Sequence, residues 1–124
     1  MWNRSENQIK LVMIRHGATP SNKEHRYLGR IDEGLSMEGE QALQEARNAY
    51  PYIDYLFSSP MRRCIQTARI LYPKQEIFMI PEWVEMDFGD FEGKNYVELK
   101  DNEYYQKWID SNGTLPFPNG ESRE

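Results

Sequence analysis

The tripeptide Arg15-His16-Gly17 directly follows a run of four apolar residues at positions 11–14. The run predicts a strand over residues 9–14 that is buried on both faces. The tripeptide would then place a cation, a nucleophile-capable imidazole and a backbone without a side chain at the carboxyl edge of a sheet, where open α/β sheets bind ligands. A neutral imidazole can attack phosphorus, and a glycine lets the backbone approach a phosphate. These residue types therefore indicate an anion site with a histidine nucleophile, although the tripeptide alone is weak evidence.

Further along the chain, two kinds of side chain suit the same chemistry. Arg15 and Arg63 each present a planar guanidinium fork that fits the non-bridging oxygens of a phosphoryl group. Arg63 also lies in the first turn of a predicted helix, where free backbone N–H groups favour an anion. Glu85 follows a predicted strand, and desolvation by Trp83, Met86 and Phe88 would raise the pKa of its carboxyl group. Taken one at a time, these groups are more simply explained as an ordinary histidine, helix-surface arginines and a solvated acidic loop.

Length and composition limit the class of protein. A chain of 124 residues with net charge −5 and a single cysteine, Cys64, is one domain without an internal disulfide, which fits a cytoplasmic protein. The apolar run at 11–14 is too short for a signal sequence or a membrane span. Residues 1–70 carry a net charge of +2 and residues 71–124 one of −7. The net negative charge argues against nucleic-acid binding, and the arginines of the basic half suggest a small anionic ligand, although ordinary surface charge explains the distribution more simply.

The remaining elements alternate between helices and strands. Ser36 is a good N-cap, and helical spacing of apolar residues continues from it until Pro51 ends the helix. A second helix is predicted to start with Ser59 as its cap and Pro60 at its first position. We also expect strands at 53–57 and 76–80, one or two helices within 96–110, and loops at 18–35, 87–93 and 111–124. Such alternation is typical of a βαβ architecture with a mainly parallel sheet.

Three motifs occur in order along the chain: Arg15-His16-Gly17-x-Thr19-x-x-Asn22, Ser58-Ser59-Pro60-Met61-x-Arg63-x-x-Gln66-Thr67-Ala68, and Glu85-x-x-x-Gly89-x-x-Glu92-Gly93. Together they resemble the histidine phosphatase superfamily, the phosphoglycerate-mutase-like enzymes, from about residue 10 to the end of the chain. Three motifs in the right order are far more specific than a lone Arg-His-Gly. The resemblance implies a three-layer αβα fold with a mainly parallel sheet and one domain over residues 1–124. It implies neither a metal nor a cofactor, and neither His16 nor His25 has metal-ligand spacing.

The resemblance also implies a role for each site residue. His16 would accept the phosphoryl group as a phosphohistidine, with its attacking nitrogen unprotonated and its other nitrogen hydrogen-bonded. Nearby arginines favour loss of the imidazole's positive charge. Arg15 and Arg63 would bind the phosphate, Arg63 being chosen over Arg62 because the family's arginine is the second of such a pair. Glu85 would protonate the leaving alcohol and then assist water. Contacts to the phosphate or substrate are expected from Gly17, Thr19, Asn22 and Arg30.

Finer features resemble the alpha-ribazole phosphatase branch of bacterial cobalamin synthesis. They are Arg26-Tyr27-Leu28-Gly29-Arg30-x-Asp32, Phe88-Gly89-Asp90-Phe91-Glu92-Gly93-Lys94, Tyr105-x-x-Trp108 and Pro118-Asn119-Gly120-Glu121-Ser122. The resemblance implies a small phosphorylated metabolite, alpha-ribazole 5′-phosphate, as the partner, with neither nucleic acid nor membrane involved. A broad-specificity phosphatase, a phosphoglycerate mutase and a non-catalytic phosphate-binding remnant stay open, and an unrelated flavodoxin-like binding module leaves the arginine and histidine placements unexplained.

The chain departs from the family's pattern after Gly120-Glu121-Ser122. Family members continue with a helix and then a strand ending in a second catalytic histidine, whereas this sequence stops at Glu124. A missing hydrogen-bond donor to the phosphoryl oxygens often costs orders of magnitude in rate. We therefore expect this chain to be the amino-terminal portion of a longer enzyme, with a C-terminally incomplete fold and an open strand edge. Alone it is expected to be poorly stable or to self-associate as a homo-oligomer, and to be inactive or nearly so.

Overall fold

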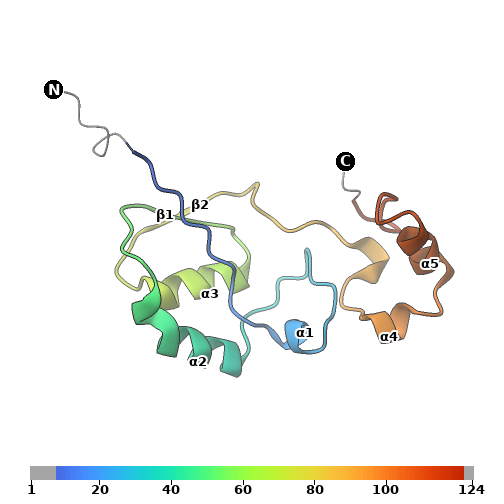
Figure 1. The fold of residues 1–124 in the computed structure, drawn as a ribbon, viewed down its shortest axis with the longest axis horizontal. Helices are drawn as coiled ribbons and strands as arrows, with labels where there is room; N and C mark the ends of the chain where they lie inside the picture. The colour runs from blue at the N-terminus through green and yellow to red at the C-terminus, as the bar shows by residue number, and fades with distance from the viewer. Residues whose placement is uncertain (1–7, 122–124) are drawn as a thin grey trace.

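The computed structural model describes residues 8–121 (Figure 1). Its elements, in chain order, are α1 (Pro20–Lys23), α2 (Met37–Ala46), the 3-10 helix η2 (Arg47–Ala49), β1 (Leu56–Ser58), α3 (Arg62–Leu71), β2 (Ile77–Met79), the 3-10 helix η3 (Gly89–Phe91), α4 (Tyr96–Leu99) and α5 (Glu103–Asp110). In Figure 1, α2 and α3 lie on one side of the two strands, and a long connection leads from β2 to η3, α4 and α5. None of the helices in the described residues is long and apolar enough to cross a bilayer.

The strands β1 and β2 form a two-stranded parallel sheet, and α3 is the crossover between them. Leu56 pairs with Ile77 and Ser58 with Met79. The Ile80 N–H extends the pairing by donating to the Ser58 carbonyl over 2.9 Å. The predicted strands at 53–57 and 76–80 are therefore present, and their parallel pairing is confirmed. Both are shorter than predicted, because the two segments pair over only three residues each.

The helix predicted after Ser36 is confirmed. The Ser36 Oγ accepts the Gly39 N–H over 3.0 Å, and Glu38 and Glu40 lie in the first turn, where the helix dipole favours carboxylates. The helix continues as η2 and the chain leaves it before Pro51. Leu43 is the buried apolar residue of α2, which packs against α3.

The helix α3 begins later than the sequence predicts. Met61 is its N-cap, so Pro60 lies outside the helix, and Ser59 does not cap it. The reason is local: the Ser59 Oγ accepts the Met61 N–H over 3.2 Å and thereby closes the turn before the helix. On the inner side of this helix region Met61, Ala68 and Leu71 are buried, whereas Ile65 is half-buried.

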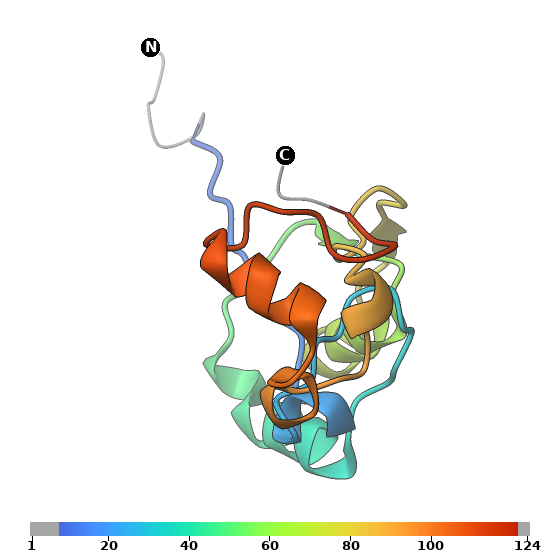
Figure 2. The same ribbon diagram turned by 90° about the vertical axis from the view of Figure 1, so that its right-hand side faces the viewer.

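The second half of the described chain has a core of its own, built from Phe91, Leu99, Tyr105 and Phe117. Asn95 and Asn102 cap α4 and α5 through their side-chain oxygens, so the predicted helical region is two short helices. Residues 111–121 curve back toward η3 (Figure 2), and the Asp90 N–H donates to the Pro118 carbonyl over 2.7 Å. This core is joined to the first half by Tyr27, whose ring lies 6.3 Å from that of Tyr105, centroid to centroid.

Further sequence predictions differ from the structure. Residues 9–14 form no strand, and Ile9, Leu11 and Met13 are 95%, 80% and 88% exposed rather than buried on both faces. An apolar run becomes a buried strand only where neighbouring strands pair with it, and within residues 8–121 none does. For the same reason the described part of the chain shows a two-stranded sheet in place of three full layers. The predicted loops at 18–35 and 87–93 contain α1 and η3. Of the C-terminal loop, residues 122–124 lie outside the described residues.

The exposed apolar run at residues 9–13 predicts self-association, because extended apolar backbone with free N–H and C=O groups pairs readily with another chain. The double variant Leu11→Lys/Met13→Lys is expected to sediment closer to the 14.8 kDa monomer than the wild-type chain does. The control is Met37→Lys/Val97→Lys, which places the same charges on apolar residues that are 84% and 67% exposed on helices. Equal sedimentation of the two double variants contradicts the prediction.

Candidate phosphate site

His16 is half-buried, and its ring is fixed by its own backbone neighbour. The Nδ1 atom lies 2.7 Å from the Gly17 carbonyl oxygen. Since a carbonyl oxygen can only accept, Nδ1 must be the donor in this contact. In the neutral ring the proton then sits on Nδ1, which leaves the lone pair on Nε2. The contact thus corresponds to the Nδ1–H tautomer, in which Nε2 carries the free lone pair.

The loop after His16 is tied to α3, the helix that carries Arg63. The Gly17 N–H donates to Thr67 Oγ1 over 2.9 Å, and Thr67 Oγ1 donates to the Arg63 carbonyl over 2.7 Å. On its other side Gly17 packs so tightly against α2 that an added Cβ would lie 2.7 Å from Leu43 Cδ1. A larger residue here would have to displace the Leu43 side chain, and the loop is held between two helices.

Arg63 is 2% exposed, and its guanidinium is held by the loop of residues 29–31. Its Nη1 donates to the Ile31 carbonyl over 3.0 Å and its Nη2 to the Gly29 carbonyl over 2.9 Å. Both acceptors are neutral, and no carboxylate in the described residues forms an ion pair with it. A buried cation that has no counter-charge favours an anionic ligand. Arg62 is exposed, so of the two neighbouring arginines Arg63 is the one directed into the protein.

Glu92 holds together the two loops that surround Arg63 and Glu85. Its carboxylate accepts the N–H groups of Gly29, Arg30 and Phe88 over 3.1, 2.7 and 3.3 Å. Gly29 is the residue whose carbonyl holds Arg63, so Glu92 supports that contact from behind. Glu92 belongs to the third motif, which predicts no role for it, and no local pattern marks its contacts with the backbone of Gly29 and Arg30.

The Arg30 guanidinium contacts the backbone carbonyl of Glu85 and not its carboxylate. The Arg30 Nε donates to the Glu85 carbonyl over 2.7 Å, and Arg30 Nη2 pairs with the Glu121 carboxylate at 2.9 Å. The Glu85 carboxylate is exposed and accepts the Met86 N–H over 3.0 Å. The predicted desolvation of Glu85 by aromatic residues is not seen, because Trp83 is 54% exposed and Phe88 packs toward the second core.

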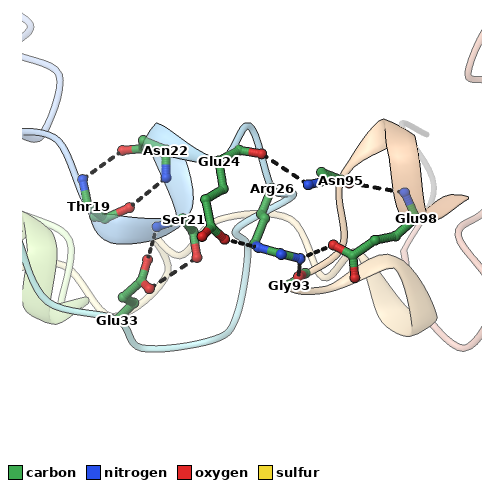
Figure 3. A network of polar contacts seen from close by, with 9 residues as sticks. All are labelled: Thr19, Ser21, Asn22, Glu24, Arg26, Glu33, Gly93, Asn95 and Glu98. Atoms are coloured by element: carbon green, nitrogen blue, oxygen red, sulfur yellow. Dashed lines mark hydrogen bonds and ion pairs between the residues drawn. The ribbon is translucent and has the colours of Figure 1, made fainter.

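Thr19 and Asn22 are brought together, but with each other. Thr19 is fully buried, and the two side chains form a capping box around α1 with bonds of 3.2 and 3.1 Å (Figure 3). Their oxygen atoms therefore satisfy backbone N–H groups, and the amide NH₂ of Asn22 is left as the group that a ligand can contact. Arg15 is exposed, and it makes no hydrogen bond or ion pair with any residue between 8 and 121.

A polar network next to α1 links this loop to α4 (Figure 3). Arg26 pairs with Glu24 and Glu98 and donates to the Gly93 carbonyl over 2.7 Å. These carboxylates raise the pKa of the Arg26 guanidinium, and the hydrogen bond that Arg26 donates to Glu24 is the largest cause. Arg26 thus serves as a tie between two segments, and its charge is already balanced.

Two acids near the site are kept neutral by burial. Burial raises the pKa of the Cys64 thiol, next to Arg63 on α3, above its ordinary value. Burial, aided by the hydrogen bond to Tyr105, raises the pKa of the Tyr27 phenol as well. Both groups stay protonated at neutral pH, so Cys64 does not compete with His16 as a nucleophile.

Between residues 8 and 121 no three side chains of His, Cys, Asp or Glu are grouped so that they could hold a metal.

Residues 11–124 match the family described as "Histidine phosphatase superfamily (branch 1)". The chain belongs to the histidine phosphatase superfamily. Among its relatives, the 2,3-bisphosphoglycerate-dependent phosphoglycerate mutase of Bifidobacterium longum is 32% identical over 121 residues, a match that covers 86% of this chain and 48% of the relative. Phosphoserine phosphatase 1 of Hydrogenobacter thermophilus is 28% identical over 120 residues, covering 92% of this chain and 57% of the relative.

The fold of this chain is similar to that of a solved structure, the alpha-ribazole phosphatase from Shigella flexneri. The TM-score is 0.72 at 30% identity, and the match covers 88% of this chain and 57% of that one. The histidine phosphatase fold predicted from the sequence is thereby supported for the part that this chain contains. The chain spans about half the length of the curated relatives that it matches.

The burial of Arg63 makes its removal costly. In Arg63→Met, the carbonyls of Gly29 and Ile31 lose their donors, and we expect the free energy of unfolding to fall by about 1–3 kcal/mol. Urea denaturation followed by circular dichroism measures the change. The matched control is Arg62→Met, one position earlier and exposed, which is expected to stay within about 0.5 kcal/mol of wild type. Equal losses in the two variants would show that the Arg63 contacts do not stabilise the loop.

Proposed function

We propose that this chain carries the phosphoryl-accepting site of a phosphomonoester hydrolase that acts through a phosphohistidine at His16. The observation that supports this most strongly is the buried, uncompensated Arg63, which Thr67 links to the loop of His16. Because the Nδ1 proton of His16 is held by Gly17, Nε2 is available for attack. Arg63 then offers a fixed positive charge for the phosphoryl oxygens, and Arg15, Gly17 and Asn22 supply the further contacts.

In the proposed reaction, the Nε2 lone pair of His16 forms a bond to phosphorus as the bond between phosphorus and the ester oxygen breaks. The electron pair of that bond stays on the leaving oxygen, which takes a proton from the Glu85 carboxyl group. Water then attacks phosphorus, and the Glu85 carboxylate accepts its proton. The bond between phosphorus and Nε2 breaks, returning the electron pair to His16 and releasing phosphate. Glu85 is exposed at the surface of its loop, so its carboxylate can rotate toward a bound ester.

For the substrate we propose alpha-ribazole 5′-phosphate. The motifs that resemble the alpha-ribazole phosphatase branch and the similarity to the Shigella flexneri structure support this choice. The Arg30 side chain lies beside Glu85, because its Nε donates to the Glu85 carbonyl. Arg30 is the residue proposed to contact the part of the substrate beyond the phosphate. A mutase acting on phosphoglycerate is the second candidate, because the relative from Bifidobacterium longum carries that name. Release of free phosphate, rather than transfer to a second hydroxyl, separates the two.

The phosphohistidine gives a direct prediction. Incubation of the chain with ³²P-labelled alpha-ribazole 5′-phosphate is expected to label the protein with a bond that is labile in acid and stable in alkali. His16→Ala removes the nucleophile and should abolish the label, whereas His25→Ala, a control at the other histidine, should keep it. The same test with labelled phosphoserine and phosphoglycerate compares the substrates. Stable labelling of His16→Ala, or no label in the wild-type chain with any of the three esters, contradicts the proposal.

Glu85 can be tested by the leaving group. In Glu85→Gln, phosphate release from an alkyl phosphate is expected to fall by about 100-fold, a typical value for loss of a general acid. With p-nitrophenyl phosphate the first step needs little protonation, so the rate of the initial nitrophenol burst should fall far less. Glu82→Gln is the control, since it removes an exposed carboxylate three residues earlier. Equal losses with both esters would exclude Glu85 as the acid.

A further inference from the structure

Thr67 belongs to the second motif, yet neither the motif nor the proposed reaction gives it a task. It is 4% exposed, and its hydroxyl is engaged on both sides. As a donor it bonds the carbonyl of Arg63, four residues earlier in α3, over 2.7 Å. As an acceptor it receives the Gly17 N–H over 2.9 Å. Because the single hydroxyl proton is committed to the helix, an oxygen lone pair is necessarily left for Gly17.

Gly17 in turn determines how the His16 ring is held. Its N–H is fixed by Thr67, and its carbonyl oxygen accepts the His16 Nδ1 proton over 2.7 Å. Its Cα faces Leu43 and Leu35 with no free space. Thr67 therefore fixes the peptide group between His16 and Gly17, and the carbonyl that accepts the Nδ1 proton lies in the next peptide group, on the other side of the Gly17 Cα. Rotation of this backbone would move the acceptor away from Nδ1.

We propose that Thr67 is a positioning residue for His16: through the backbone of Gly17, its hydroxyl keeps the imidazole in the Nδ1–H tautomer, with the Nε2 lone pair free for phosphorus. The proposal rests on the proposed function for its catalytic meaning, but the structural coupling can be measured without turnover. The same hydroxyl also donates to the backbone carbonyl of Arg63. Thr67 therefore contacts both the loop of the proposed nucleophile and the helical turn of the proposed phosphate-binding cation.

The test compares Thr67→Val with Thr67→Ser. Valine keeps the shape and removes the hydroxyl, whereas serine keeps the hydroxyl. Long-range ¹H–¹⁵N spectra of the imidazole, with His25→Gln in all proteins so that only His16 is seen, report which nitrogen carries the proton. We expect the Nδ1–H form in wild type and in Thr67→Ser, and a mixture of tautomers in Thr67→Val. An unchanged tautomer in a folded Thr67→Val overturns the proposal.

A second measurement needs no substitution at position 67. In the wild-type chain the amide of Gly17 should exchange with solvent at least about tenfold more slowly than that of Ala18, since a lost or formed hydrogen bond changes opening equilibria by about that factor. Ala18 is the control because it is the next residue and exposed. Equal exchange of the two amides overturns the proposal even if Thr67→Val does not fold.

Labelling with the ³²P ester connects the coupling to chemistry. Thr67→Val is expected to form phosphohistidine about 5- to 10-fold more slowly at saturating ester, with little change in the ester concentration for half-maximal rate, and Thr67→Ser should restore the rate. Loss of apparent affinity with an unchanged maximal rate overturns the positioning role. If wild type takes no label while the tautomer responds to Thr67→Val, the proposed function fails and the coupling stands. If labelling occurs and the tautomer is insensitive, only the coupling fails.

Discussion

The burial of the Arg63 guanidinium against the carbonyls of Gly29 and Ile31 is the contact on which the site depends. A buried cation tolerates little disorder around it, because every lost acceptor leaves charge without compensation. The loop of residues 29–31 must therefore keep its carbonyls turned toward α3. Glu92 makes this conformation stable from the opposite side by accepting the N–H groups of Gly29 and Arg30.

The helix α3 organises the site through residues on one face. Arg63 holds the carbonyls of the 29–31 loop, Gln66 accepts the Leu35 N–H over 2.7 Å, and Thr67 accepts the Gly17 N–H. Three segments distant in sequence thus take their positions from side chains spaced three and four residues apart, which share a helical face. The loop of His16 and the turn that carries Arg63 thus both take their positions from one helix, which is what the proposed phosphoryl transfer requires of its nucleophile and its cation.

Local signals in the sequence account for much of the fold. Ser36 as a cap, Pro51 as a stop and the parallel strands around α3 follow from patterns that need only nearby residues. Residues 9–14 show where such reasoning ends, because their apolar character predicts a strand but cannot supply the strands that would bury it. Residues 20–23 form a helix of a single turn, held by the capping box of Thr19 and Asn22. A helix this short has no apolar periodicity, so the sequence predicts a loop there.

The site divides in the same way. The residue types of His16 and Arg63 could be found from the sequence because their chemistry is specific. The contacts of Thr67 and Glu92 could not, since each bonds a backbone group 50 or more residues away, and backbone groups carry no sequence signal. The exposure of Glu85 was also beyond the sequence, because the direction of its aromatic neighbours is decided by the second core.

Titration calorimetry with orthovanadate, an analogue of the transferring phosphoryl group, tests most directly whether buried Arg63 forms an anion site. We expect one vanadate to bind to the wild-type chain and to Arg62→Lys. Arg63→Lys keeps the charge but loses the planar fork, so its affinity should fall about tenfold or more. Arg63→Lys binding as tightly as Arg62→Lys, or no vanadate binding to the wild-type chain, would contradict this expectation.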